Sequence, residues 1–170
     1  MRIPTRILTE TSIIVALSVI LKDVLPPVYS LPQGGSVSVA GMVPLLWFSL
    51  RRGPYFGSFA GALYGLVHSA LGGFRHWYYP IQGILDYPIA YAALGLAGLF
   101  RTKPLVGVGF AITGRFICSF LSGMIFFTGF SLVGAIASAI YNGTYLVFEF
   151  VISAIIIYPL TKRGLINIYM

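Results

Sequence analysis

Charged residues are scarce in this chain of 170 residues, and only four of them are acidic. Just 9% of the residues are charged, against about 25% in a soluble domain, whereas 58% are hydrophobic. This composition excludes a soluble globular protein and is typical of a polytopic helical membrane protein. The 20 glycines and 10 prolines fit that class, because glycine permits close helix contacts in a membrane and proline is tolerated there.

Cysteine is almost absent, since Cys118 is the single one. An intramolecular disulfide is therefore excluded, a thiolate metal site is implausible, and we expect no cofactor or metal. The net charge of +7 does not indicate nucleic-acid binding, because the positive residues lie between apolar runs instead of clustering on a soluble face. Arg2 and Arg6 precede the first apolar run without a small-residue cleavage site after it, so we expect a retained helix and not a signal peptide.

Six apolar segments follow one another along the chain. They cover residues 6–21, 37–50, 54–71, 81–100, 105–127 and 133–160, and the second is short and contains Pro44. At about 1.5 Å of rise per residue, most can cross a hydrocarbon core of about 30 Å. We therefore predict an all-α fold in which residues 1–170 form a single transmembrane domain of six helices.

The distribution of lysine and arginine predicts the orientation of this bundle. With a cytoplasmic N-terminus, eight positive residues lie on the inner side and two on the outer side, as the positive-inside rule requires. The inner residues are Arg2, Arg6, Arg51, Arg52, Arg101, Lys103, Lys162 and Arg163, and the outer ones are Lys22 and Arg75. A five-helix arrangement would spoil this asymmetry. We predict a multi-pass protein of the cytoplasmic membrane with both termini inside.

Asp86 is an acidic residue within the fourth apolar segment. A carboxylate there costs roughly 2.5–3.5 kcal/mol on insertion scales, so it normally faces an interior cavity or a partner and not lipid. It lies near the outer end of its segment, beside Tyr87 and below the aromatic connection 72–80 that contains His76. A carboxylate among aromatic rings suits an organic cation. We therefore predict that Asp86 binds a ligand from outside, with His76 at the rim.

The fifth and sixth segments each carry a polar stripe. The stripes are Arg115, Ser119 and Ser122 in the fifth and Asn142, Tyr145 and Glu149 in the sixth, at spacings that share one helix face. The residues alone favour a buried ion pair between Arg115 and Glu149 that holds the helices together. Contact of Arg115 with a bound group stays open.

Three other polar or small residues have simpler interpretations. His68 is the only histidine of the third segment, where a lone histidine is typical of a packing residue. Ser12 and Ala16 in the first segment form a small-xxx-small pair, which lets another helix approach closely. The spacing alone favours a partner helix from the same bundle.

Six stretches together resemble a known family. They are LTE at 8–10, PQGGSVSV at 32–39, SLRRG at 49–53, QGILDYPIAYAALGLAGLF at 82–100, GRFICSFLSGMIFF at 114–127 and YNGTY at 141–145. They span nearly the whole chain and resemble the thiamine-specific substrate-binding (S) components of energy-coupling factor (ECF) vitamin transporters.

The resemblance implies capture of thiamine, or of a thiamine-like cation or precursor, from the outside for ATP-driven import. It implies a site near the outer face that is closed by the connection 25–36. It also implies that this chain is no enzyme: transport would need a membrane-embedded coupling subunit and two cytoplasmic ATPases.

The family's pattern also suggests residue roles. Asp86 and Tyr87 match the carboxylate–tyrosine pair that binds the aminopyrimidine, and Gly123 and Asn142 match further binding positions. The predicted substrate-binding set is Asp86, Tyr87, Ser119, Gly123, Phe127, Asn142 and His76. Ser12 and Ala16 match the docking surface for the coupling subunit.

This chain departs from the family's pattern at several of these positions. Ser119 stands where members often have histidine, Phe127 where tryptophan is common, and Ala137 where a tyrosine precedes the asparagine. The carboxylate of Asp86 is one methylene shorter than that of glutamate.

The sequence leaves other functions open. The chain fits an S component for a different vitamin or for a pyrimidine precursor. An intramembrane enzyme is disfavoured, because the four acids and two histidines are scattered and form no H-E-x-x-H or repeated aspartate motif. A self-sufficient ion-coupled transporter usually needs more chain and internal repeats.

Overall fold

Proline marks the start of most helices in the computed structural model, which describes residues 4–32 and 35–164. Proline occupies the first turn of four helices: α2 (Val43–Arg52), α3 (Pro54–Leu71), α4 (Pro80–Ile84) and α6 (Pro104–Ser122). This position needs no backbone N–H and suits the fixed φ of proline. The last helix, α7 (Leu132–Lys162), begins instead at Ser131, whose hydroxyl accepts a hydrogen bond of 3.0 Å from the backbone N–H of Gly134.

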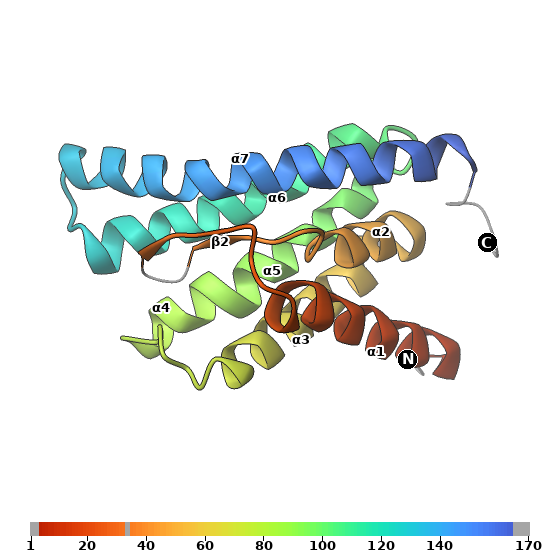
Figure 1. Ribbon diagram of the computed structural model, residues 1–170, viewed down its shortest axis with the longest axis horizontal. Helices are drawn as coiled ribbons and strands as arrows, with labels where there is room; N and C mark the ends of the chain where they lie inside the picture. Colours follow the sequence, from red (N-terminus) through yellow and green to blue (C-terminus); the bar gives the residue numbers. More distant parts are fainter. Residues whose placement is uncertain (1–3, 33–34, 165–170) are drawn as a thin grey trace.

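These elements form a bundle of six helical runs, which confirms the predicted all-α membrane fold (Figure 1). The first run is α1 (Thr5–Val19), which continues as a π-helical turn over Ile20–Val24. The fourth run joins α4, a π-helical turn (Leu85–Ile89), α5 (Ala90–Ala92) and a 3-10 stretch (Ala93–Phe100).

Three of these runs are long and apolar enough, by length and composition, to cross a membrane. They are Pro80–Phe100, Pro104–Phe127 and Leu132–Lys162. The beginning of α1 and the end of α7 lie at the same end of the bundle (Figure 1), as an even number of crossings requires. We refer to this end as the inner end and to the opposite one as the outer end.

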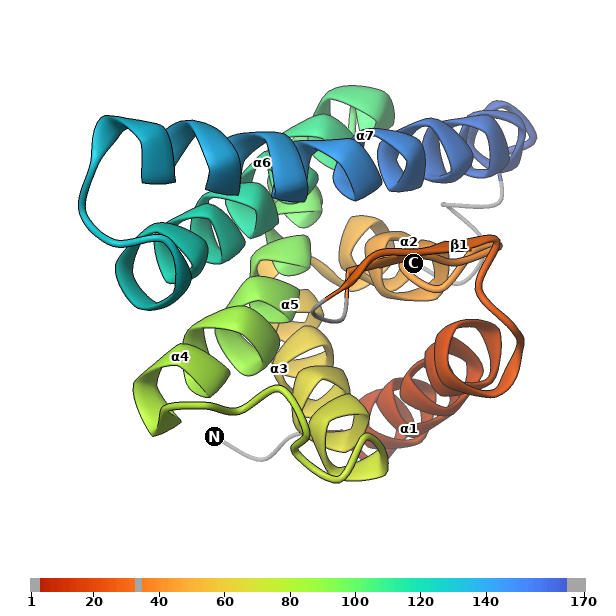
Figure 2. The same ribbon diagram turned by 60° about the vertical axis from the view of Figure 1, so that its left-hand side comes forward.

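The predicted start of the second helix was wrong. Residues 37–42 are not helical: β2 (Ser36–Val37) pairs antiparallel with β1 (Tyr29–Ser30), and α2 begins only at Val43 and runs on to Arg52. The physical reason is Pro44, which favours the first turn of a helix over its interior. The hairpin made by the two strands passes between α1 and α7 (Figure 2).

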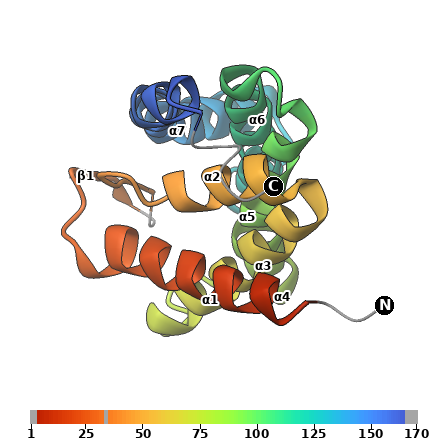
Figure 3. The ribbon, with the colours of Figure 1, turned by 90° about the vertical axis from the view of Figure 1, so that its right-hand side faces the viewer.

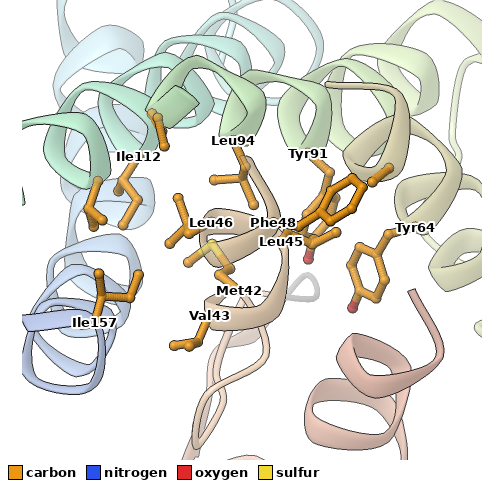
Figure 4. Packing of buried hydrophobic residues seen from close by; sticks show 14 of the residues in the cluster. Met42, Val43, Leu45, Leu46, Phe48, Tyr64, Tyr91, Leu94, Ile112 and Ile157 are labelled. Atoms are coloured by element: carbon orange, nitrogen blue, oxygen red, sulfur yellow. The ribbon is translucent and has the colours of Figure 1, made fainter. Parts of the chain in front are cut away.

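Helix α2 lies at the centre of the inner half of the bundle, between α1 and the pair α6 and α7 (Figure 3). Side chains on several sides of α2, and Met42 just before it, project outward into the hydrophobic core between the surrounding helices (Figure 4). Leu45, Leu46 and Leu50 are fully buried there. Because the other helices enclose α2, its ten residues need not span the membrane.

Glycines let α3 pack directly against the backbone of the fourth run. A Cβ on Gly61 would overlap the carbonyl group of Tyr91, and a Cβ on Gly65 would lie 2.6 Å from the carbonyl oxygen of Tyr87. Close approach at small residues is the usual way in which membrane helices gain packing energy. This contact fixes the positions of Tyr87 and Tyr91, which both belong to the site described below.

Replacing Gly65 with alanine is expected to lower the thermal unfolding temperature of the detergent-solubilised protein. Overpacking against a backbone carbonyl costs about 1–3 kcal/mol. The matched control is G143A, because a Cβ on Gly143 in α7 would meet its nearest neighbour, a ring carbon of Phe116, at 3.9 Å. Equal unfolding temperatures for the two variants would contradict this account of the packing.

Candidate ligand-binding site

A cavity of about 320 Å³ lies in the outer half of the bundle. Its walls come from the end of the first run, the hairpin, α3, the loop before α4, the fourth run, α6 and α7. The lining residues are Lys22, Gly35, Ser36, His68, His76, Gln82, Asp86, Tyr87, Tyr91, Arg115, Ser119, Gly123, Phe127, Thr128, Ala137, Ser138, Tyr141, Asn142 and Tyr145. Its size falls in the range of about 300–1,000 Å³ that small-molecule sites occupy.

All seven substrate-binding residues predicted from the sequence line this one cavity. The fourth run contributes two of them, α6 with its π-helical end three, α7 one, and the loop between α3 and α4 one. The structure thus brings together residues from four parts of the chain. Their contact with a ligand stays a prediction.

π-helical turns supply lining residues on three sides of the cavity. They end the first run at Ile20–Val24, widen the fourth run at Leu85–Ile89 and end α6 at Gly123–Phe127. The middle one contains Pro88, which has no N–H to continue the α-helical pattern. Such turns are frequent at functional sites because they re-aim side chains. Lys22, Asp86 and Phe127 are all presented in this way.

The protein holds the Asp86 carboxylate in a fixed orientation. Its Oδ2 accepts hydrogen bonds of 2.6 Å from the Gln82 side-chain amide and 2.6 Å from the Ser122 hydroxyl. The amide oxygen of Gln82 accepts in turn from the backbone N–H of Tyr78, at 3.1 Å. Both of these bonds end on Oδ2, and the Ser119 side chain is a further hydrogen-bond partner of the carboxylate. A carboxylate has about four lone-pair sites, so Asp86 keeps acceptor capacity for a ligand.

Aromatic rings form a continuous wall beside Asp86. The ring of Tyr87 lies 6.2 Å from the Trp77 ring, nearly parallel to it, and 5.5 Å from the His68 ring. His68 is stacked on Tyr64 at 5.7 Å. At the outer end, the Phe127 ring meets Tyr78 edge-on at 5.4 Å. Such ring faces attract organic cations.

Asn142 joins α6 and α7 across the cavity wall. Its side-chain NH₂ donates to the backbone oxygens of Ser119 (3.2 Å) and Ser138 (3.0 Å). Its amide oxygen accepts from the Tyr145 hydroxyl at 3.0 Å. These contacts use both amide hydrogens, so the group that Asn142 can still offer a ligand is an acceptor lone pair.

Gly123 permits this close approach of the two helices. A Cβ at this position would overlap the Ser138 hydroxyl and lie 3.5 Å from the side-chain nitrogen of Asn142. An alanine here would therefore displace the Ser138 hydroxyl, which also contacts the side-chain nitrogen of Asn142.

The predicted ion pair between Arg115 and Glu149 was wrong. Glu149 pairs instead with Lys22 at 3.1 Å, and it accepts hydrogen bonds of 2.8 Å from both the backbone N–H and the hydroxyl of Ser38. The Lys22 and Glu149 side chains are 4% and 1% exposed. Arg115 forms no salt bridge with any carboxylate of the described residues.

Lys22 was misplaced because the prediction ended the first helix at residue 21 and assigned Lys22 to an outer loop. The π-helical turn carries the helix on to Val24. In the structure Lys22 continues the buried face of the first run, whose residues recur at helical spacing. They are Thr11, Val15, Ser18 and Lys22.

Asp23 and His68 form a second contact at the end of the first run. Asp23 Oδ1 lies 2.5 Å from His68 Nδ1, and Asp23 Oδ2 accepts from the Tyr64 hydroxyl at 3.2 Å. His68 is thus a hydrogen-bonded packing residue, as expected, but it also lines the cavity. No role for Asp23 was predicted from the sequence.

The hairpin covers the cavity as the predicted connection 25–36 would, although Gln33 and Gly34 lie outside the described residues. The Tyr141 hydroxyl donates to the carbonyl of Pro32 and accepts from the N–H of Gly35, at 2.9 Å. Lys22 donates to the carbonyl of Ser36 at 3.0 Å. Two side chains from the bundle thereby hold the hairpin over the site.

The described residues contain no group of three or more histidine, cysteine, aspartate or glutamate side chains that could hold a metal ion. Cys118 is half-buried in α6 and is not a cavity-lining residue. The arrangement of the cavity is suited to binding an organic molecule through hydrogen bonds and ring faces.

Comparisons with known proteins agree with one another. A family model described as "Thiamine transporter protein" matches residues 8–167. Thiamine transporter ThiT of Bacillus subtilis (strain 168) is 37% identical over 169 residues, 88% of this chain and 87% of that protein. Thiamine transporter ThiT of Lacticaseibacillus paracasei is 26% identical over 176 residues, 89% of this chain and 84% of that protein. A solved structure of ThiT from Listeria monocytogenes has the same fold, with a TM-score of 0.80 at 24% identity over 94% of both chains.

Removing one partner of the Lys22–Glu149 pair is expected to destabilise the protein far more than removing both. K22M or E149M leaves an uncompensated buried charge, which costs about 3–5 kcal/mol, whereas replacing both charges by apolar groups is often close to neutral. Thermal unfolding of K22M, E149M and the double variant in detergent, without ligand, measures this coupling. K103M, at an exposed inner lysine, is the control. Additive losses in the double variant would show that the pair is not coupled.

Proposed function

The chain belongs to the thiamine transporter protein family, and we propose that it is a thiamine-capturing S component in which the cavity described above is the thiamine site. In this role it binds thiamine from the outer side of the cytoplasmic membrane. The inner excess of lysine and arginine supports an orientation with both termini inside.

One observation carries the assignment of the site: a carboxylate held by the protein beside a wall of aromatic rings in a covered cavity. Thiamine joins an aminopyrimidine, which has N–H donors, to a permanently cationic thiazolium ring. The Asp86 carboxylate accepts from the aminopyrimidine, and the rings of Tyr87 and Phe127 offer faces to the two heterocycles. Burial under the hairpin lowers the local dielectric and strengthens these contacts.

The departures at positions 119 and 127 reduce the number of groups that reach the ligand. Ser119 is shorter than histidine, and its backbone carbonyl is used by Asn142. Phe127 is 39% exposed at the cavity mouth, where it keeps a ring face without an indole N–H. In this site Asp86 is therefore the main source of polar recognition, with Asn142 Oδ1 as a second acceptor.

Closure of the site depends on Tyr141. Its hydroxyl contacts the backbone on both sides of the hairpin turn, at Pro32 and Gly35. The hairpin acts as a lid that keeps the ligand out of water until it is released.

Import requires partners that supply energy, and the surface of α1 suits one of them. Ser12 and Ala16 are exposed on the outside of the bundle, so the first helix does not use them for packing within this chain. Small residues on an outward helix face permit close contact with another membrane helix. We assign this face to a membrane-embedded ECF coupling subunit, which works with two cytoplasmic ATPases.

Replacing Asp86 with asparagine is expected to weaken thiamine binding by about 10–150-fold, because hydrogen bonds to charged groups contribute about 1.5–3 kcal/mol. Isothermal titration calorimetry on the purified protein measures the change. E10Q is the matched control, since Glu10 pairs with Arg52 and Arg6 away from the cavity. The site assignment is wrong if D86N binds as tightly as the wild type, and the thiamine assignment is wrong if the wild-type Kd is weaker than about 1 μM.

Tryptophan at Ser12 or Ala16 is expected to abolish thiamine uptake by the reconstituted whole transporter and to leave thiamine affinity of the isolated chain unchanged. The indole would hold a neighbouring helix away from α1. I155W serves as the control, because Ile155 is 66% exposed on α7, on another helix. Normal uptake by A16W would remove this face of α1 as the docking surface.

A further inference from the structure

Arg115 is a buried charge that the contacts described above leave without a counter-ion. It is 5% exposed and lines the cavity. Its Nη1 lies 2.7 Å from the sulfur of Met42, and its Cζ lies 3.9 Å from the centroid of the Tyr91 ring. Within the described residues, no carboxylate approaches it within 4.0 Å and its buried Nε has no hydrogen-bond partner. A guanidinium in this position retains donors for an acceptor from outside the protein.

Arg115 and Asp86 lie at different depths in the cavity. Helix α6 runs outward, and Arg115 precedes Ser122, the hydrogen-bond donor to Asp86, by seven residues, which is about 10 Å at a rise of 1.5 Å per residue. The fourth run goes inward, and Tyr91, which Arg115 covers, follows Asp86 by five residues. Both helices therefore place the carboxylate outward of the guanidinium.

The other charged residues near the cavity have partners of their own. Lys22 is paired with Glu149, and both oxygens of Asp23 are hydrogen-bonded, to Tyr64 and to His68. Among the described residues that line the cavity, Asp86 and Arg115 have no salt-bridge partner. The cavity therefore has a negative charge nearer its mouth and a positive charge at its inner end. A ligand with one cationic and one neutral end is oriented by such a gradient.

We infer that Arg115 determines which end of the ligand enters first. This inference rests on the proposed function, and it assigns the neutral aminopyrimidine to the space between Asp86 and Arg115. The exocyclic amine donates to Asp86, and Arg115 donates to a ring nitrogen. Arg115 repels the thiazolium cation, which lies at the outer aromatic rim around Phe127 and Tyr78. Arg115 is thus a specificity residue that selects a neutral acceptor for the inner end of the cavity.

The test compares fragments of the ligand on the purified full chain. The probes are thiamine, its neutral hydroxymethyl-aminopyrimidine fragment, a cationic N-methylated hydroxyethylthiazolium fragment, and thiamine monophosphate. R115M is expected to weaken thiamine and the pyrimidine by a similar factor of at least ten, and to leave the thiazolium fragment unchanged or tighter. R115K, which keeps the charge, is expected to preserve the wild-type order of affinities. R163M, at an exposed inner arginine, is the control.

Three results would overturn the inference. In the first, R115M weakens the thiazolium fragment as much as the pyrimidine. In the second, it leaves thiamine and the pyrimidine unaffected. In the third, only thiamine monophosphate loses affinity, which would make Arg115 a phosphate subsite. Failure of the wild type to bind thiamine would instead refute the proposed function.

A second measurement needs no variant and so is independent of the folding of R115M. The wild-type chain is titrated with two thiamine analogues, each with one pyrimidine nitrogen replaced by a C–H group. One of them is expected to bind at least tenfold more weakly than thiamine, because it offers Arg115 no acceptor. Equal affinity of both analogues and thiamine would contradict the assignment.

Discussion

The contact between Lys22 and Glu149 joins the parts of this protein that enclose the site. Lys22 lies in the last turn of the first run, and Glu149 lies in the middle of α7. Ser38 donates to the same carboxylate from the segment after the hairpin. Taking two charges out of water is unfavourable unless each finds a partner and further hydrogen bonds. Because the partners come from different elements, the cavity walls assemble only when α1, the hairpin and α7 are all in place.

Much of the fold follows from patterns that a single helix displays. Six apolar segments and the inner excess of positive charge predict six helices, with limits close to the observed ones for most of them. The second span was misjudged because residues 37–42 are apolar enough for a helix, yet they lead from a strand to Pro44. Only pairing with Tyr29–Ser30, which lies in another segment, makes the strand favourable.

The site was predictable where one residue type is out of place in its surroundings, as Asp86 is. It was not predictable where several partners could form the same ion pair. Arg115 and Glu149 have opposite charges and lie on polar helix faces, but Lys22 forms the salt bridge with Glu149. Helical spacing places a side chain on a face, whereas the relative depth and rotation of two helices decide the pairing. For this reason Asp23, Tyr141 and Lys22 became visible only in the assembled bundle.

The first helix packs against the bundle with one face and exposes the other face on the outside of the protein. Its buried stripe of Thr11, Val15, Ser18 and Lys22 faces the bundle and ends at the cavity, whereas Ser12 and Ala16 are exposed on the other side. The cavity wall and the outward small-residue pair therefore lie on opposite sides of the same helical run. They are separated by its diameter of about 10–12 Å. Lys22 and Asp23 tie the outer end of that element to α7 and α3. The hydrogen bond from Lys22 to Ser36 therefore connects the hairpin to the helix that carries the outward face.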